Sequence, residues 1–267
     1  MSETSTLFDP GLLRQGLQRH HSGLELHYLP TCASTNQECL QLKRHGSVVI
    51  SDRQTAGRGR RGRDWYSPYK RNLYCSLGID KVLPASSLGL VSLLVGVGLA
   101  DTLHAEGFDD VGLKWPNDLL RDGRKLGGIL IETTVRQAGG FYLTVGIGLN
   151  LQLQDHDLER IGQPAAGLWS AIPSRRQASE LVARLISGVF GEVERFEPTQ
   201  GDALLQRFAG FDVLVGHQVT VLSAHDEQHG HYAGVEPDGR LRIETDHGLQ
   251  TFVAADVSLR SSSHAAG

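Results

Sequence analysis

The most informative stretch of this sequence is Gln54-Thr55-Ala56-Gly57-Arg58-Gly59-Arg60-Arg61-Gly62-Arg63-Asp64-Trp65. Its central residues, 57–63, comprise three glycines and four arginines. Glycine lets backbone N–H groups approach an anion closely, and arginine supplies a permanent charge with a planar fork of donors. Strand-like apolar runs flank the stretch at residues 48–50 and 73–77. We therefore interpret residues 54–65, the Gly/Arg loop, as an anion-binding loop within a folded domain, mobile until its ligand binds.

Other interpretations of this loop fit the sequence less well. Its three glycines match G-x-G-x-x-G, but a dinucleotide-binding fold needs a helix directly after them, and residues 64–68 are typical of a turn. Protein kinases share the pattern, but the chain contains no H-R-D or D-F-G tripeptide. A disordered basic arm for nucleic acid is the remaining alternative, although such an arm rarely connects two core strands. Trp65 and Tyr66 are interpreted as core residues, with the wall of a pocket as the alternative.

The composition is that of an ordinary globular protein. The chain has 267 residues, of which 40% are hydrophobic and 21% charged, enough for one large core with or without a small satellite domain. The net charge of −4 argues against a general surface for nucleic acid or anionic membranes. The Gly/Arg loop is therefore a local basic exception, which favours a dedicated anion site.

Cysteine usage and the N-terminus favour a cytoplasmic protein. Cys32, Cys39 and Cys75 are odd in number and lack C-x-x-C spacing, which argues against a disulfide framework or a zinc site. The chain does not begin with a charged stretch followed by an apolar core, so we expect no signal peptide. We expect the most apolar run, residues 88–100, to be too short to span a bilayer.

Hydrophobic periodicity predicts strands and helices up to about residue 210. The expected strands are residues 24–29, 47–50, 72–79, 111–116, 125–132 and 141–150, the last two forming a hairpin. The expected helices cover residues 88–103 and 177–196, and another begins near Thr35, where Glu38 has capping-box spacing. For residues 34–38, an ordinary helix start is the simpler interpretation, and a polar ligand clamp is the alternative.

Short strands separated by turns recur after residue 210 and predict a small antiparallel barrel. We therefore expect a poorly ordered lead-in over residues 1–23, a larger domain over 24–210, the barrel over 211–260 and a disordered tail over 261–267. Residues 152–176 are polar and irregular, and we expect a surface loop there.

The polar residues of the loop and the strand ends indicate a site for anions. They are Arg58, Arg60, Arg63, Lys114, Lys125, Asn36, Gln54, Asn117 and Asn150. The chain contains neither a P-loop motif nor G-x-S-x-G, so the site has donors and positive charge without an evident nucleophile. Gly146 and Gly148 on one strand leave room for a flat or narrow ligand. Such a site suits a carboxylate attacking a phosphate.

Five motifs, taken together in order and spacing, resemble those of the biotin–protein ligases. They are Ser34-Thr35-Asn36, the Gly57–Trp65 segment, Lys114-Trp115-Pro116-Asn117-Asp118, Lys125-Leu126-Gly127-Gly128-Ile129-Leu130 and Gly146-Ile147-Gly148-Leu149-Asn150. The resemblance covers about residues 24–260. It implies an α+β fold: a mixed, largely antiparallel sheet packed with helices, as in class II synthetases, followed by an SH3-like barrel. It also implies that biotin and Mg-ATP form biotinyl-5′-AMP, and that a lysine of a biotin carboxyl carrier domain then accepts the biotinyl group.

The resemblance also assigns roles to particular residues. It implies catalytic roles for Lys125, Arg60 and Arg58. It implies contacts to biotin from Ser34, Thr35, Asn36, Gln54, Gly57, Arg58, Gly59, Arg60, Trp65, Lys125, Gly128, Gly146 and Gly148. It implies contacts to ATP from Arg58, Arg60, Arg63, Lys114, Asn117 and Asn150. No metal ligand is assigned.

The resemblance leaves the partner and two alternatives to be decided. About 30 residues precede Ser34, which leaves no room for the DNA-binding domain of the family's bifunctional members, so we expect a monofunctional enzyme that does not bind DNA. We expect a monomer or a weak homodimer with no membrane association. A lipoate- or octanoate-transferring relative is one alternative, which the intact Gly/Arg loop and the Lys114–Asp118 motif disfavour. A nucleic-acid-binding protein is the other, and it predicts strongly salt-dependent binding.

Overall fold

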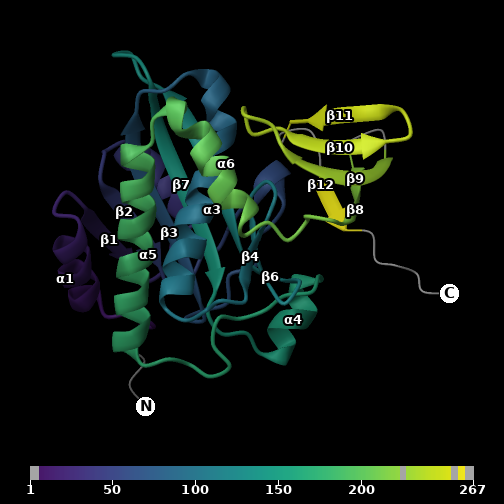
Figure 1. Cartoon of the computed structure of the whole chain (residues 1–267). Coiled ribbons are helices and arrows are strands. Elements are labelled where there is room, and N and C mark those ends of the chain that lie inside the picture. Colours follow the sequence, from purple (N-terminus) through teal and green to yellow (C-terminus); the bar gives the residue numbers. More distant parts are fainter. Residues whose placement is uncertain (1–5, 223–226, 254–257, 262–267) are drawn as a thin grey trace.

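The computed structural model describes residues 6–222, 227–253 and 258–261. Within them, a seven-stranded mixed sheet carries helices on its faces, and a five-stranded antiparallel sheet lies to one side of it (Figure 1). This arrangement confirms the predicted α+β class and the small C-terminal β-domain.

The large sheet holds the strands on which most of the predicted site lies. Across it the order is β1 (Glu25–Leu29), β2 (Ser47–Ser51), β3 (Asn72–Lys81), β7 (Phe141–Asn150), β6 (Arg124–Val135), β5 (Asp118–Arg121) and β4 (Val111–Lys114). In this described sheet β1 and β2 run parallel, and the other neighbours are antiparallel. β6 and β7 form the predicted hairpin.

The two faces of this sheet differ in what covers them. One face packs against α3 (Leu88–Ala105) and α5 (Arg175–Arg195), with α1 (Pro10–His20) and α6 (Gly201–Ala209) against those helices. The other face contacts α2 (Thr35–Leu42) and the Gly/Arg loop. Because side chains alternate along a strand, β7 sends Val145, Ile147 and Leu149 into the helical core. Gly146 and Gly148 therefore face α2 and the loop.

The N-terminal segment is more ordered than the sequence indicated. Residues 10–20 form α1, in which Leu13 and Leu17 are buried and which packs against α5. The Asp9 carboxylate caps this helix by accepting hydrogen bonds from two backbone N–H groups of its first turn. The prediction of a poorly ordered lead-in is therefore wrong for this helix, because it overlooked the Asp9-Pro10 start signal.

Helix α3 follows a 3₁₀ turn (Ala85–Ser87), and the two form an apolar stretch of 21 residues. By length and composition alone this stretch could cross a membrane, so the expectation that it is too short is wrong. However, 61% of its most apolar window is buried inside the protein, and α3 contacts α5, α6 and the sheet. Packing in the core therefore accounts for its apolar composition.

Residues 152–176, expected to be an irregular loop, contain a short helix, α4 (Asp155–Ile161). Its first turn holds Asp157, whose side chain is fully buried. The Asp157 carboxylate accepts hydrogen bonds from the Gln154 N–H at 2.9 Å and from the Tyr66 hydroxyl at 3.1 Å. The helix therefore holds the segment that directly follows the Gly/Arg loop.

The C-terminal sheet has the order β11 (Gly248–Phe252), β10 (Leu241–Thr245), β9 (Glu227–Val235), β8 (Gln218–Leu222) and β12 (Ser258–Ser261). The first predicted residues of this domain are hydrogen-bonded to β4, since Leu113 N–H donates to Phe211 O and Val213 N–H donates to Leu113 O. The connecting segment is therefore tied to β4. Residues 262–267 of the expected disordered tail lie outside the described residues.

Candidate active site

A cavity of about 980 Å³ opens on the face of the sheet that α2 and the Gly/Arg loop cover. Its volume lies at the upper end of the range for small-molecule sites and could accommodate two adjacent ligands. Most of the predicted site residues line it: Ser34, Thr35, Asn36, Gln54, Arg58, Gly59, Arg60, Arg63, Trp65, Lys114, Asn117, Lys125, Gly128, Gly146 and Gly148. The fold thus gathers into one site residues that the sequence spreads over more than 110 positions.

The Gly/Arg loop folds into a hairpin at the edge of this cavity. Gly59 N–H donates to Arg63 O at 2.7 Å, and Trp65 N–H donates to Gly57 O at 3.0 Å. A 3₁₀ turn (Arg60–Gly62) closes the hairpin, and its last residue has a φ of 71°, which glycine adopts without strain. The hairpin brings several arginines to one end of the cavity. Mobility of the loop before ligand binding stays a prediction.

The start of α2 forms a polar end of the cavity. Both the N–H and the hydroxyl of Thr35 donate to Gln54 Oε1, at 2.9 and 3.1 Å. Ser76 Oγ, on β3, lies 2.8 Å from Thr35 Oγ1 and 2.6 Å from Asn36 Oδ1. The predicted capping box is not formed, since the N-cap is Ser34 and no side chain caps the helix. The Thr35 hydroxyl donates to Gln54 instead, and both residues line the cavity. A role of this helix start as a ligand clamp stays a prediction.

Glu132 on β6 is a residue of this region that sequence analysis missed. Asn36 Nδ2 donates to Glu132 Oε2 at 2.7 Å, and Arg58 Nη2 lies 3.8 Å from Glu132 Oε1. This carboxylate therefore links α2 to the Gly/Arg loop. Alternation along β6 offered a signal, because Glu132 shares a face with Gly128, which lines the cavity.

Glycines form the floor of the cavity beneath Asn36 and Trp65. A side chain at Gly146 would collide with Asn36 Oδ1, and a Cβ at Gly148 would lie 2.6 Å from the Trp65 ring. Trp65 lines the cavity, so its interpretation as a core residue is wrong. Its buried Nε1 has no hydrogen-bond partner among the described residues. Because the glycines have no side chains, Asn36 and Trp65 can pack directly onto the sheet at the cavity.

Lys125 stands between the floor and the cationic part of the site. Its Nζ lies 2.8 Å from Asp118 Oδ1 and 5.7 Å from the centroid of the Trp65 ring. Both partners of the ion pair are largely, but not fully, shielded from solvent, with side-chain exposures of 20% and 25%. The ammonium group is thus available to a negatively charged ligand in the cavity.

The opposite part of the cavity is cationic. Arg60 Nη1 donates to Asn117 Oδ1 at 3.3 Å, and Asn117 Nδ2 donates to Ile129 O at 2.8 Å. Burial, together with the neighbouring Arg61, lowers the pKa of Arg60. An arginine stays charged at neutral pH despite such a shift, and its partial desolvation strengthens its attraction for a phosphate.

Two predicted site residues lie outside the cavity wall. Asn150 is buried behind it, where its Nδ2 donates to Lys125 O at 3.3 Å and its Oδ1 accepts from Asn72 Nδ2 at 3.1 Å. Gly57 packs inside the hairpin, since a Cβ there would lie 2.7 Å from Trp65 O. The structure thus places both as supports for the residues that line the cavity.

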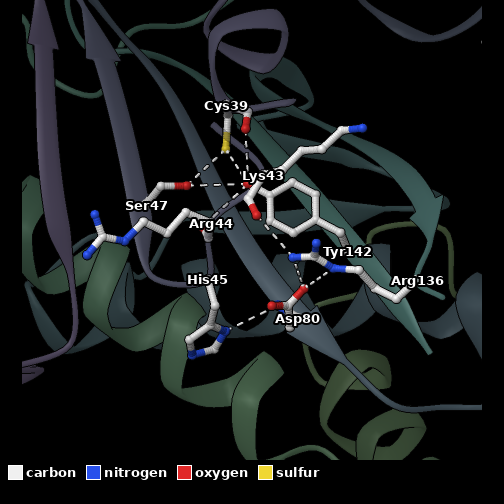
Figure 2. Close-up of polar contacts among 8 residues, drawn as sticks. All are labelled: Cys39, Lys43, Arg44, His45, Ser47, Asp80, Arg136 and Tyr142. Atoms are coloured by element: carbon white, nitrogen blue, oxygen red, sulfur yellow. Dashed lines mark hydrogen bonds and ion pairs between the residues drawn. The ribbon is translucent and has the colours of Figure 1, made fainter. Parts of the chain in front are cut away.

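The far end of α2 is anchored by a separate polar cluster (Figure 2). Tyr142, on β7, donates its hydroxyl proton to Cys39 O at 3.0 Å. Arg136 packs over the Tyr142 ring, 4.9 Å from its centroid, and donates to Lys43 O at 3.0 Å and Asp80 Oδ1 at 2.6 Å. These contacts hold the C-terminal end of the helix, so its N-terminal end is presented to the cavity in a fixed orientation.

Comparisons with known proteins agree with this geometry. Residues 29–150 match the biotin/lipoate A/B protein ligase family, and residues 214–260 match the biotin protein ligase C-terminal domain. The bifunctional ligase/repressor BirA of Salmonella typhimurium is 34% identical over 91% of this chain and 78% of its own length. The biotin–[acetyl-CoA-carboxylase] ligase of Mycobacterium tuberculosis is 34% identical over 87% of this chain and 88% of its own length.

A solved structure shows the same fold. The biotin protein ligase from Aquifex aeolicus in complex with biotin and ATP superimposes with a TM-score of 0.69 at 26% identity, covering 89% of this chain and 99% of that one. The fold and the matched family model thus place the chain in the class of biotin/lipoate protein ligases. Within that class, the chain belongs to the biotin protein ligase family, which confirms the resemblance drawn from the five motifs.

Proposed function

We propose that this chain is an ATP-dependent biotin–protein ligase, which activates biotin as biotinyl-5′-AMP and transfers the biotinyl group to a lysine of a biotin carboxyl carrier domain. The observation that carries this proposal is a single cavity, lined by the polar residues at the start of α2 and by the arginines of the Gly/Arg loop, in which Lys125 lies beside Asp118 and Trp65. The Aquifex relative, whose structure contains biotin and ATP, supports the same pair of substrates.

In the first half-reaction, a biotin carboxylate oxygen attacks the α-phosphorus of ATP and diphosphate leaves. Thr35, Asn36 and Gln54 offer the donors and acceptors that a ureido ring needs, and the fused rings would lie in the part of the cavity that Gly146, Gly148 and Trp65 line. Lys125 would neutralise the carboxylate as it approaches the phosphate, and then the oxygens of the mixed anhydride. Such preorganised charge is commonly the largest single contribution to catalysis.

The nucleotide would lie in the cationic part of the cavity, against Arg60, Arg63, Lys114 and Asn117. Among the described residues no group of three or more His, Cys, Asp or Glu could hold a metal ion. That composition fits Mg²⁺ entering on the phosphates of ATP, because this ion is commonly held by one or two carboxylates together with substrate phosphates. Asp118, which lines the cavity, would supply such a carboxylate, and the ion would neutralise phosphate charge.

In the second half-reaction, the amine of the carrier lysine attacks the anhydride carbonyl, an amide bond forms and AMP leaves with the bonding electrons. The hairpin of the Gly/Arg loop would retain the adenylate and exclude water until the carrier docks. Arg58, Arg60 and Arg63 line the cavity, which supports a role toward the adenylate rather than toward DNA. Cys32, Cys39 and Cys75 are free and buried, which supports a reducing, cytoplasmic setting.

The test is exchange of labelled diphosphate into ATP with Mg²⁺ and either biotin, lipoate or octanoate. We expect exchange with biotin alone, followed by biotin-dependent modification of a carrier domain. Exchange with lipoate or octanoate in place of biotin would overturn the assignment of the acid. Absence of exchange with every acid, from protein shown to be folded, would refute the adenylating step.

Replacing Glu132 with glutamine should weaken the use of biotin. The amide can still accept a hydrogen bond from Asn36 but carries no charge to attract Arg58. We expect KM for biotin to rise about five- to tenfold, equivalent to roughly 1–1.4 kcal/mol, with a smaller rise in KM for ATP through Arg58. Steady-state exchange kinetics measure both constants. The exposed neighbour Thr133, replaced by alanine, is the control, and equal behaviour of the two variants would remove Glu132 from the site.

A further inference from the structure

The C-terminal sheet contacts the catalytic domain at the segment that carries predicted nucleotide-binding residues. Trp115 is 1% exposed, and its indole N–H donates to the carbonyl oxygen of Gly239 at 3.0 Å, in the turn between β9 and β10. In the sequence Trp115 lies between Lys114 and Asn117, both of which line the cavity. This buried hydrogen bond therefore connects the C-terminal turn to the cationic part of the site.

Two glycines allow the turn to approach this closely. A Cβ at Gly89, in the first turn of α3, would lie 2.7 Å from Asp238 O. A Cβ at Gly239, whose φ is 87°, would lie 2.9 Å from the carbonyl carbon of Gly89. One turn further along the same helix, the Ser92 hydroxyl donates to Pro116 O at 3.0 Å. The start of α3 thus contacts the C-terminal turn and, through Ser92, the segment after Trp115.

The connecting segment makes a second link between the two parts. Leu113 N–H donates to Phe211 O at 2.7 Å, and Val213 N–H donates to Leu113 O at 3.0 Å. Further along, Leu214 and His217 join Val213 in lining the cavity. Residues that lead into the C-terminal sheet therefore form part of the cavity wall and hold β4, the strand that ends at Lys114.

We propose that the C-terminal turn, residues 237–239, is a positioning element for adenylation that fixes Lys114 and Asn117 through its contacts with Trp115 and Gly89. The inference rests on the proposed ligase function and deepens it. All of these contacts lead to the cationic part of the cavity, and none leads to Thr35, Asn36 or Gln54. Displacing the turn therefore weakens the use of ATP and leaves the use of biotin unchanged.

The test is Gly89→Ala, which adds one methyl group 2.7 Å from the carbonyl oxygen of Asp238, so that the C-terminal turn has to move. Alanine favours a helix more than glycine does, so the change does not weaken α3 itself. We expect KM for ATP in the biotin-dependent exchange reaction to rise about tenfold, since displacements of about 1 Å in a site have effects of this order or larger. KM for biotin and the unfolding temperature should stay close to those of the unaltered protein.

Gly201→Ala is the matched control. A Cβ there faces the same turn but meets Pro237 O at 3.8 Å and Leu90 Cδ1 at 3.7 Å, which are ordinary contacts. A second variant, Trp115→Phe, keeps an aromatic ring but removes the N–H donor, and it should raise KM for ATP in the same direction and by less.

Equal rises in KM for ATP and biotin, or identical kinetics of Gly89→Ala and Gly201→Ala, would overturn the inference. If Gly89→Ala does not fold, an unchanged KM for ATP in Trp115→Phe would overturn it. Absence of biotin-dependent exchange in the unaltered chain would refute the proposed function instead. Calorimetric binding of ATP would then still test the turn, and equal affinity in the unaltered and Gly89→Ala proteins would contradict its role.

Discussion

Replacing Lys125 with alanine should slow adenylate formation strongly while the protein stays folded. Lys125 lines the cavity, and its Nζ lies 2.8 Å from Asp118 and 5.7 Å from the centroid of the Trp65 ring. Without it, the biotin carboxylate and the α-phosphate would approach each other with one fewer compensating charge. We expect the rate of diphosphate exchange to fall about 10²- to 10³-fold, equivalent to roughly 3–4 kcal/mol of lost transition-state stabilisation.

The fold should tolerate this change because the Asp118 side chain is 25% exposed, so its carboxylate can be hydrated when Lys125 is removed. Circular dichroism and thermal unfolding check that point. The control is Arg124→Ala, on the adjoining position of β6, where the side chain is 57% exposed and lies 3.8 Å from Asp122. Normal exchange by folded Lys125→Ala protein would exclude Lys125 from the mechanism.

The parts of this site that sequence reasoning found are those with a strong local signature. The Gly/Arg loop could be interpreted without the fold, because glycine and arginine each have a limited set of physical uses at that density. The floor glycines, at positions 146 and 148, were also predictable, because alternation places both on one face of a strand. The structure adds what fills the space above them, namely Asn36 and Trp65.

What sequence reasoning missed depends on contacts between distant segments. Glu132 can be assigned to the site only through its hydrogen bond with Asn36, 96 positions away in the sequence. The Gly239 carbonyl can be assigned a role only through its hydrogen bond with Trp115, 124 positions away. Alternation along β6 places Glu132 on the face of the cavity but does not identify Asn36 as its partner, and the turn that holds Gly239 has no periodicity to interpret. The wrong interpretation of Trp65 has the same origin. The sequence around a tryptophan next to a turn does not show whether the ring packs in the core or, as here, over a glycine floor.

Replacing Gly146 with alanine should raise KM for biotin selectively. The added methyl group would collide with Asn36 Oδ1. Asn36 cannot move aside at low cost, because Glu132 accepts its Nδ2 proton at 2.7 Å and Ser76 Oγ lies 2.6 Å from its Oδ1. We expect KM for biotin to rise about 10- to 100-fold, which corresponds to the roughly 1–3 kcal/mol that overpacking of a well-packed site costs.

A rise in KM for biotin without a rise in KM for ATP would distinguish a glycine that lies beneath the bound biotin from one that only packs in the core. KM for ATP should change by less than about threefold, because the cationic part of the cavity does not contact Gly146. The matched control is Gly96→Ala, in helix α3, which packs against the opposite face of the sheet. A Cβ there meets only side-chain carbons of Leu113 and Ile129, at 3.4 Å or more. If Gly146→Ala raised both constants equally, or matched Gly96→Ala, the strand would be a structural support, and the biotin rings would have to lie against another wall of the cavity.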